Sequence, residues 1–228
     1  VEATTGVVPV SVGKPAPYLL EAAAHAVGRQ AGEAIMIGDG IGTDLAAADI
    51  RATIGTKEFV AGLPHWLRLR NPSKDTVLYP AVAYPTYEMG AILARLRAVR
   101  VPATADGRLD LDAVDPADVD RSLMLWLNSP ANPTGRLDDL GAAATWGRRH
   151  GIPVFSDECY VEFTWAGPSR TILEHGLDGV VSVHALAKRA NLAGARAGFY
   201  AGDRELVQYL REVRKHAGQM VPGPVQAA

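Results

Sequence analysis

Hydrophobic and polar positions follow one another along the chain in a repeating block pattern. Apolar runs of about six residues lead into a polar or glycine-containing turn and then into a stretch with helical periodicity. This order is typical of βαβ units and predicts a largely parallel sheet. We expect strands at residues 34–37, 76–79, 98–101, 122–128, 153–156, 180–186 and 198–201. Helices are expected at residues 18–27, 43–49, 56–67, 86–97, 137–149 and 204–216.

The composition indicates a globular chain without the marks of a nucleic-acid or membrane protein. With 228 residues, 48% of them apolar, the chain can bury a substantial core. The net charge is −2 and acids are interspersed with bases, which argues against nucleic acid as a partner. No window reaches the ~20 apolar residues of a membrane span, and no secretory signal opens the chain. The one cysteine, Cys159, excludes an intramolecular disulfide and suits the cytoplasm.

Polar side chains gather where the predicted strands end. In an open α/β sheet the ligand crevice lies outside the carboxyl ends of the strands, so these segments should converge. They are residues 55–58, 84–87, 128–135, 156–160 and 188–196. Together they supply an acid, two phenols, an amide, an amine and a guanidinium. Lys188 stands eight positions before Arg196, and a nearby cation or partial desolvation increases the unprotonated fraction of an amine, which makes Lys188 a candidate nucleophile.

Each segment taken alone has an ordinary structural interpretation. Residues 132–135 read Asn-Pro-Thr-Gly, which is a common turn. Asp157 at a strand end is more often a cap or a loop anchor than a ligand-binding group. Tyr84 and Tyr160 are common half-buried aromatics. The order of all these segments in one chain is harder to explain by chance, and it favours a single functional site.

The same segments resemble the large, cofactor-binding domain of the fold-type I aminotransferases that use pyridoxal phosphate. The likeness covers about residues 53–228 and falls in the class I/II group that includes succinyl-diaminopimelate aminotransferases. It implies a three-layer αβα sandwich, with Lys188 bonding covalently to the cofactor and moving the proton between the substrate α-carbon and the cofactor. Asp157 would keep the pyridine nitrogen protonated. Asn132 and Tyr160 would hydrogen-bond the ring's phenolic oxygen, and Tyr84 would stack on the ring face.

The resemblance assigns the cofactor phosphate to two elements. One is the guanidinium fork of Arg196, and the other is the run of backbone N–H groups of Gly55, Thr56 and Lys57 at the start of a helix. The family usually has a hydroxyl residue three positions before the lysine, where this chain has Ala185. The loss of one hydrogen bond to a charged acceptor, on the order of 1–3 kcal/mol, predicts weaker cofactor binding.

The resemblance also implies a reaction and an assembly. The enzyme would move an amino group between an amino acid and a 2-oxo acid, with the succinyl-diaminopimelate reaction of lysine biosynthesis as the candidate. It would use pyridoxal 5'-phosphate, need no metal and form a homodimer with its sites at the subunit interface. The family's N-terminal arm and C-terminal small domain are not recognisable here, so we expect the large domain, residues 53–228, to be truncated at both ends.

Residues 1–52 have a different character. Lys14 precedes a helix, and a buried strand leads to Asp39 and Asp44, five positions apart. This resembles the C-terminal part of haloacid-dehalogenase-type phosphatases, where such a lysine and paired acids serve a phospho-aspartate and Mg²⁺. The nucleophilic aspartate of those enzymes is missing. We expect a βα fragment of different origin, joined by fusion, engineering or a faulty gene model. The alternative functions are a magnesium-dependent phosphatase remnant and a catalytically silent α/β domain.

Overall fold

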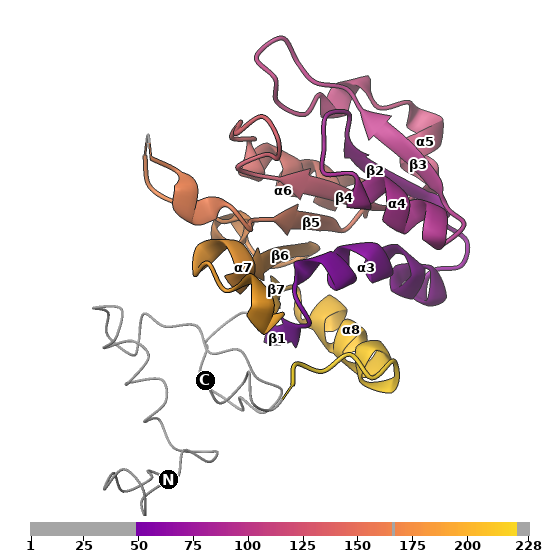
Figure 1. The fold of residues 1–228 in the computed structure, drawn as a ribbon. Helices are drawn as coiled ribbons and strands as arrows, with labels where there is room; N and C mark the ends of the chain where they lie inside the picture. The colour runs from indigo at the N-terminus through magenta and orange to yellow at the C-terminus, as the bar shows by residue number, and fades with distance from the viewer. Residues whose placement is uncertain (1–48, 166, 223–228) are drawn as a thin grey trace, which may run out of the picture.

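A single sheet lies at the centre of the molecule (Figure 1). A computed structural model describes residues 49–165 and 167–222, and within them the sheet has seven strands. The strands are β1 Asp49–Thr53, β2 Thr76–Pro80, β3 Arg97–Val101, β4 Ser122–Asn128, β5 Val154–Asp157, β6 Val180–Ala185 and β7 Gly198–Gly202. Their order is β1-β7-β6-β5-β4-β2-β3. Strand β7 is antiparallel to both of its neighbours, and the other neighbouring pairs are parallel.

Helices cover both faces of the sheet. The helices are α3 Thr56–Arg70, α4 Thr86–Leu93, α5 Pro116–Arg121, α6 Leu140–His150, α7 Leu186–Arg189 and α8 Arg204–His216, with 3-10 turns at Leu111–Ala113, Val161–Phe163, Ile172–His175 and Ala193–Ala195. Buried residues of α3, α4 and α8 share one apolar cluster with the sheet, and those of α6 share the second cluster. The expected α/β fold, a three-layer αβα sandwich with a mostly parallel sheet, is confirmed.

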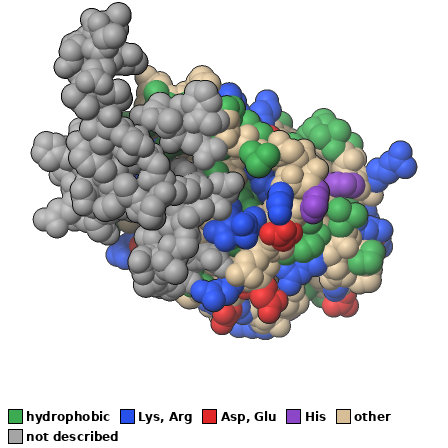
Figure 2. Space-filling model, turned by 90° about the horizontal axis from the view of Figure 1, so that it is seen from below, with side chains coloured by type: hydrophobic (Ala, Val, Ile, Leu, Met, Phe, Trp, Pro, Cys, Tyr) green, Lys and Arg blue, Asp and Glu red, His purple; other side chains and the backbone are tan. Residues whose placement is uncertain are grey.

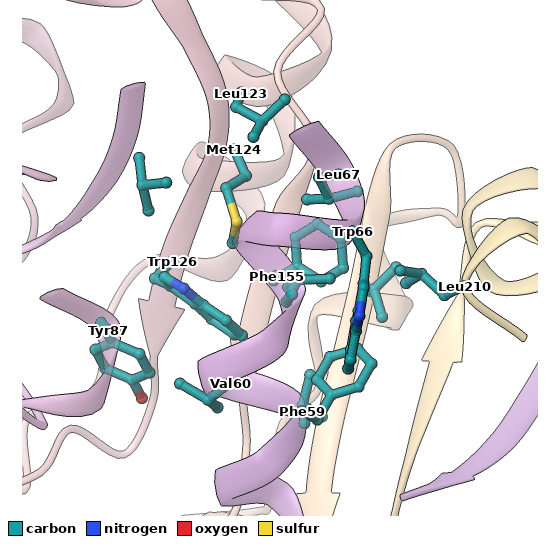
Figure 3. Close-up of a cluster of buried hydrophobic side chains, with 14 of the residues drawn as sticks. Phe59, Val60, Trp66, Leu67, Tyr87, Leu123, Met124, Trp126, Phe155 and Leu210 are labelled. Carbon is teal, nitrogen blue, oxygen red and sulfur yellow. The ribbon is translucent and has the colours of Figure 1, made fainter. Parts of the chain in front are cut away.

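The interior strand β4 shows why the sheet needs two covering layers. All seven of its residues are buried. Successive side chains of a strand point to opposite faces, so Met124 and Trp126 join the cluster with α3, α4 and α8, while Leu125 and Leu127 join the cluster with α6. Figure 3 shows Met124 and Trp126 beside side chains of α3. A strand buried on both faces accounts for the nearly continuous apolar run in the sequence.

A partly buried ion pair ties α8 to the beginning of α3. Arg214 is 3% exposed, and its guanidinium donates to both carboxylate oxygens of Glu58 at 3.0 and 2.7 Å. Glu58 also accepts the backbone N–H of Ile54 at 2.9 Å. The guanidinium carbon lies 5.0 Å from the centroid of the Trp66 ring. These contacts fix the turn between β1 and α3, which borders the candidate site.

The expected helix at residues 86–97 is too long. Helix α4 ends at Leu93, because Arg95 adopts a left-handed conformation with φ of 56° and β3 begins at Arg97. Since apolar residues continue through this stretch, the sequence pattern alone does not mark the turn.

The first described strand was not expected. Strand β1 lies at the sheet edge and begins at Asp49, where the sequence predicted the last residue of a helix. It crosses the expected boundary between the fragment at residues 1–52 and the domain at residues 53–228. The other features predicted for the first fragment lie outside the described residues: the elements at 18–27 and 34–37, Lys14, Asp39 and Asp44.

The surface shows both signs of charge close together. On the face drawn in Figure 2, acidic and basic side chains lie near one another among apolar side chains. The sequence as a whole has 23 Lys and Arg against 25 Asp and Glu. In the part of the chain that the structure describes, each helix is too short or too polar to cross a membrane.

Candidate functional site

The topology brings several strand ends to one edge of the sheet. Strands β1, β4, β5 and β6 run in the same direction, so their carboxyl ends meet there, and β7 starts at that edge because it is antiparallel. Asn128 pairs with Asp157 at the ends of β4 and β5. Gly198 pairs with both Ala185 and Thr53. The loops that follow these strands therefore surround one space, as expected for an open α/β sheet.

A cavity of about 280 Å³ occupies this edge. All nine residues predicted from the sequence line it: Gly55, Thr56, Lys57, Tyr84, Asn132, Asp157, Tyr160, Lys188 and Arg196. These residues come from five separate segments, the farthest 141 positions apart (196 minus 55). The structure thus gathers the whole candidate set, with none left on another surface.

The carboxyl group of Asp157 forms a buried wall of the cavity. Asp157 is 6% exposed, and its Oδ2 accepts the hydroxyl of Tyr87 at 2.7 Å while its Oδ1 accepts the N–H of Cys159 at 3.2 Å. Burial raises the pKa of this carboxyl, and hydrogen bonds from Cys159 and Tyr87 oppose that shift. Its neighbour Glu158 is turned elsewhere, where it accepts the N–H of Ile172 at 2.8 Å. Of these two acids, Asp157 is therefore the one that faces the cavity.

A buried asparagine organises the loop after β4. The side-chain amide of Asn128 donates to the carbonyl of Asp157 at 2.8 Å, and its oxygen accepts the N–H of Asn132 at 2.7 Å. This places Asn132 at the cavity beside the end of β5. Sequence reasoning did not select Asn128 as a site residue, although a polar residue that ends a fully buried strand was an available signal.

The candidate amine, Lys188, lies on a short helix rather than at a strand end. Strand β6 ends at Ala185, and Lys188 belongs to α7. The Nζ atom of Lys188 lies 5.7 Å from the centroid of the Tyr160 ring. On the α4 side, the ring of Tyr84 meets the ring of Tyr87 edge to face, with 5.9 Å between centroids. An amine and two phenols therefore face the cavity from different elements.

The start of α3 and Arg196 give the cavity lining groups that suit an anion. Helix α3 begins at Thr56, so its first backbone N–H groups point away from the helix with no partner inside it. Gly55 precedes them with φ of 71°, and a Cβ there would lie only 2.4 Å from a terminal nitrogen of Arg196. Arg196 itself takes a left-handed conformation with φ of 50°. Such strained backbone is common at functional sites. Glycine is needed at position 55 so that the guanidinium can approach the helix start.

These groups fit pyridoxal phosphate. The helix start and Arg196 match a phosphate, the buried carboxylate of Asp157 matches a protonated ring nitrogen, and Lys188 matches an aldehyde. Ala185 also lines the cavity and brings a methyl group where a hydroxyl was expected from the family. Among the described residues, no group of His, Cys, Asp and Glu side chains could hold a metal ion.

A second cavity of about 370 Å³ adjoins this site. It shares Asn132 and Tyr160 with the first cavity, and Leu137, Phe163 and Trp165 line its outer part. The last three are largely exposed. The shared residues, from the loops after β4 and β5, make the two cavities neighbours.

Comparisons with known proteins agree with this chemistry. The family model for aminotransferase class I and II matches residues 21–228. A probable aminotransferase of Mycobacterium tuberculosis is 44% identical over 194 residues, which cover 82% of this chain and 44% of that protein. The 4-dedimethylamino-4-oxo-anhydrotetracycline transaminase of Streptomyces rimosus is 39% identical, covering 82% of this chain and 51% of the relative. The chain thus spans about half the length of these relatives.

A solved structure supports the same conclusion. A probable N-succinyldiaminopimelate aminotransferase from Thermus thermophilus superposes with a TM-score of 0.74 and 33% identity, covering 92% of this chain and 55% of that protein. The family model, the relatives and the shared fold all point to one assignment. The chain belongs to the class I and II aminotransferases, a family that uses pyridoxal phosphate.

Proposed function

We propose that this chain is a pyridoxal-phosphate-dependent aminotransferase that moves an amino group between an amino acid and a 2-oxo acid. One observation carries the proposal: Lys188, Asp157 and Arg196, from three different segments, line the same cavity. Pyridoxal phosphate requires an amine for its aldehyde, a carboxylate for its ring nitrogen and a guanidinium for its phosphate. Membership of the family supports the same reaction.

Two residues take the chemical roles. When bound, pyridoxal phosphate supplies the aldehyde that receives the amino group and the ring that accepts electrons. Lys188 would hold the cofactor through its Nζ atom, which condenses with the aldehyde and releases water. Once a substrate amine has displaced it, the free Nζ would move the proton between the substrate α-carbon and the cofactor carbon. Asp157 keeps a proton on the ring nitrogen, because a buried carboxylate stabilises a cation beside it.

The remaining residues hold the cofactor in place. Tyr84 would pack against the ring, and Asn132 and Tyr160 would donate hydrogen bonds to its phenolic oxygen. Arg196 and the N–H groups of Gly55, Thr56 and Lys57 bind the phosphate. All of these residues line the cavity, which supports a shared role.

We place the substrate side chain in the second cavity, because it shares Asn132 and Tyr160 with the cofactor cavity. The candidate substrate is succinyl-diaminopimelate, which the name of the similar Thermus thermophilus protein suggests. The reaction would then belong to lysine biosynthesis.

The test is formation of a 2-oxo acid from an amino acid by the purified chain with added pyridoxal phosphate. Glutamate and succinyl-diaminopimelate would be compared as amino donors, with pyruvate as acceptor for the former and 2-oxoglutarate for the latter. We expect turnover that Lys188→Ala abolishes and that Lys57→Ala, at the same cavity, only reduces. Equal turnover in the parent and Lys188→Ala would contradict the proposal. Magnesium-dependent phosphate release instead would favour the phosphatase interpretation of Lys14, Asp39 and Asp44, which lie outside the described residues.

The chain is proposed to act as a homodimer in the cytoplasm. Met89, Ile92 and Leu93 lie on one side of α4, and they are 49%, 52% and 66% exposed. Covering them with a second copy removes apolar surface from water. Light scattering after gel filtration should give twice the mass of the chain. The variant Leu93→Glu should give the mass of a single chain. A monomeric parent contradicts the dimer. The cytoplasmic location rests on the single cysteine.

A further inference from the structure

Tyr87 is the residue around the cavity whose contacts the proposed function leaves unexplained. It lies on α4 with no exposed surface, 70 positions away from Asp157 in the sequence. Its hydroxyl donates to Oδ2 of Asp157 at 2.7 Å. Its ring meets Tyr84 edge to face. Tyr87 thus touches both the acid and the aromatic residue that are assigned to the cofactor ring.

The position of the Tyr87 ring is fixed by the core. It stacks on Trp126 of β4, with 5.0 Å between centroids and 26° between planes. Trp126 in turn packs against Phe155 of β5. Figure 3 shows Tyr87 beside Trp126 in this cluster. Because the ring packs against the sheet, the position of the hydroxyl that donates to Asp157 is fixed.

The hydroxyl acts as a donor only. Burial, and next the charge of Asp157, hold the pKa of Tyr87 well above its usual value, so the proton stays on the phenol. A phenol that donates to a carboxylate stabilises the ionised acid. It occupies one lone pair of Oδ2, as the N–H of Cys159 occupies one of Oδ1, and each oxygen keeps a second site for a ligand donor.

We propose that Tyr87 is a positioning residue, which holds Asp157 ionised and oriented toward the ring nitrogen of the cofactor. The inference rests on the proposed function for the identity of the ligand. The hydrogen bond itself rests on the structure alone.

Other charged and titratable groups also face Asp157. His184 of β6 lies close enough to favour the ionised form, and the thiol and N–H of Cys159 do the same from the loop. Lys188 lines the same cavity from α7. None of these groups is altered by removing the Tyr87 hydroxyl. The substitution Tyr87→Phe therefore removes one hydrogen bond to Asp157, the one that the phenol donates.

Tyr87→Phe keeps the stacked ring and removes the hydroxyl. Losing a donor to the charged form raises the pH at which Asp157 takes up a proton. The carboxylate is then lost earlier as the pH falls, and cofactor affinity falls with it. We expect the acid limb of the affinity profile for pyridoxal phosphate to move up by about one pH unit, with binding about tenfold weaker along that limb.

The matched control is Tyr209→Phe. Its hydroxyl donates to the carbonyl of Trp66 at 2.6 Å, and Tyr209 does not line the cavity. This variant loses a comparable hydrogen bond without touching Asp157. The titrations of the cofactor itself are common to all three proteins and cancel in the comparison. We expect Tyr209→Phe to keep the parent's pH profile.

A second measurement needs no cofactor. The carboxyl ¹³C signal of Asp157, identified by its loss in Asp157→Asn, would be titrated in the parent and in Tyr87→Phe. We expect the midpoint to be about one pH unit higher in Tyr87→Phe. Coincident midpoints, or an affinity loss that is the same at every pH, would overturn the role of Tyr87. A parent chain that does not bind pyridoxal phosphate would overturn the proposed function, while the carboxyl titration would still decide whether Tyr87 controls Asp157.

Discussion

Gly55→Ala adds one methyl group beside the guanidinium of Arg196 and so tests the proposed phosphate site. The added Cβ would lie 2.4 Å from a terminal nitrogen of Arg196 and 2.9 Å from its central carbon. The guanidinium must therefore leave its place over the start of α3. Gly55 also has φ of 71° and ψ of 150°, a region that residues with a side chain rarely adopt. The substitution should affect phosphate binding and stability together.

The magnitudes follow from these two effects. Losing the charged hydrogen bonds of Arg196 to a phosphate is worth about 2–3 kcal/mol, or about 30- to 150-fold in Kd for pyridoxal phosphate. Backbone strain of about 1–3 kcal/mol lowers the melting temperature by several degrees, at about 2–4 °C per kcal/mol. Fluorescence titration with the cofactor and thermal unfolding without it measure the two effects separately.

The control for Gly55→Ala is Gly194→Ala. Gly194 lies two residues before Arg196, and a Cβ at this position would meet open space. We expect parent-like cofactor affinity in this variant. If Gly55→Ala bound pyridoxal phosphate as tightly as Gly194→Ala, the guanidinium over the helix start would not be the phosphate site.

Three further predictions concern residues around the cavity. Ala185→Ser should tighten cofactor binding about tenfold by supplying a hydroxyl, and titration showing equal or weaker affinity contradicts that reason. Arg214→Met leaves Glu58 without its cation and should lower the free energy of unfolding by about 3 kcal/mol in urea, whereas a loss below about 1 kcal/mol would mean that the pair does not hold the turn before α3. Burial raises the pKa of Cys159 well above its usual value, so alkylation by iodoacetamide at pH 8 should be far slower than that of a small thiol, and a comparable rate contradicts the buried position.

The fold was predictable wherever burial leaves a periodic pattern. Strand β4 is buried along its whole length, and its expected bounds are those observed. Helix α8 alternates apolar and charged residues with helical spacing, and its bounds also match. Strand β1 was missed because an edge strand contacts only one neighbour. Its residues Ile50, Arg51 and Ala52 are only partly buried, so no apolar run marks it.

The part of the candidate site that lies at or just after strand ends was predictable from the sequence. Asp157 ends β5 and Asn132 follows β4, so the rule that parallel strands meet at one edge brings them together. Tyr87 was named only as a member of a turn, because its bond to Asp157 depends on the packing of α4 against the sheet. No spacing in the sequence encodes that contact. The left-handed turn at Arg196 is likewise set by the three-dimensional fold.

Chemical trapping shows whether the cavity holds an amine that reacts with the aldehyde of pyridoxal phosphate. The chain would be mixed with the cofactor, reduced with borohydride, digested and mapped by mass spectrometry. We expect the phosphopyridoxyl mass on Lys188 and not on Lys57, although both lysines line the cavity. Lys215→Ala, on the exposed part of α8, should label as the parent does. Label on Lys57 or spread evenly over the lysines, or no label at all, would contradict the account.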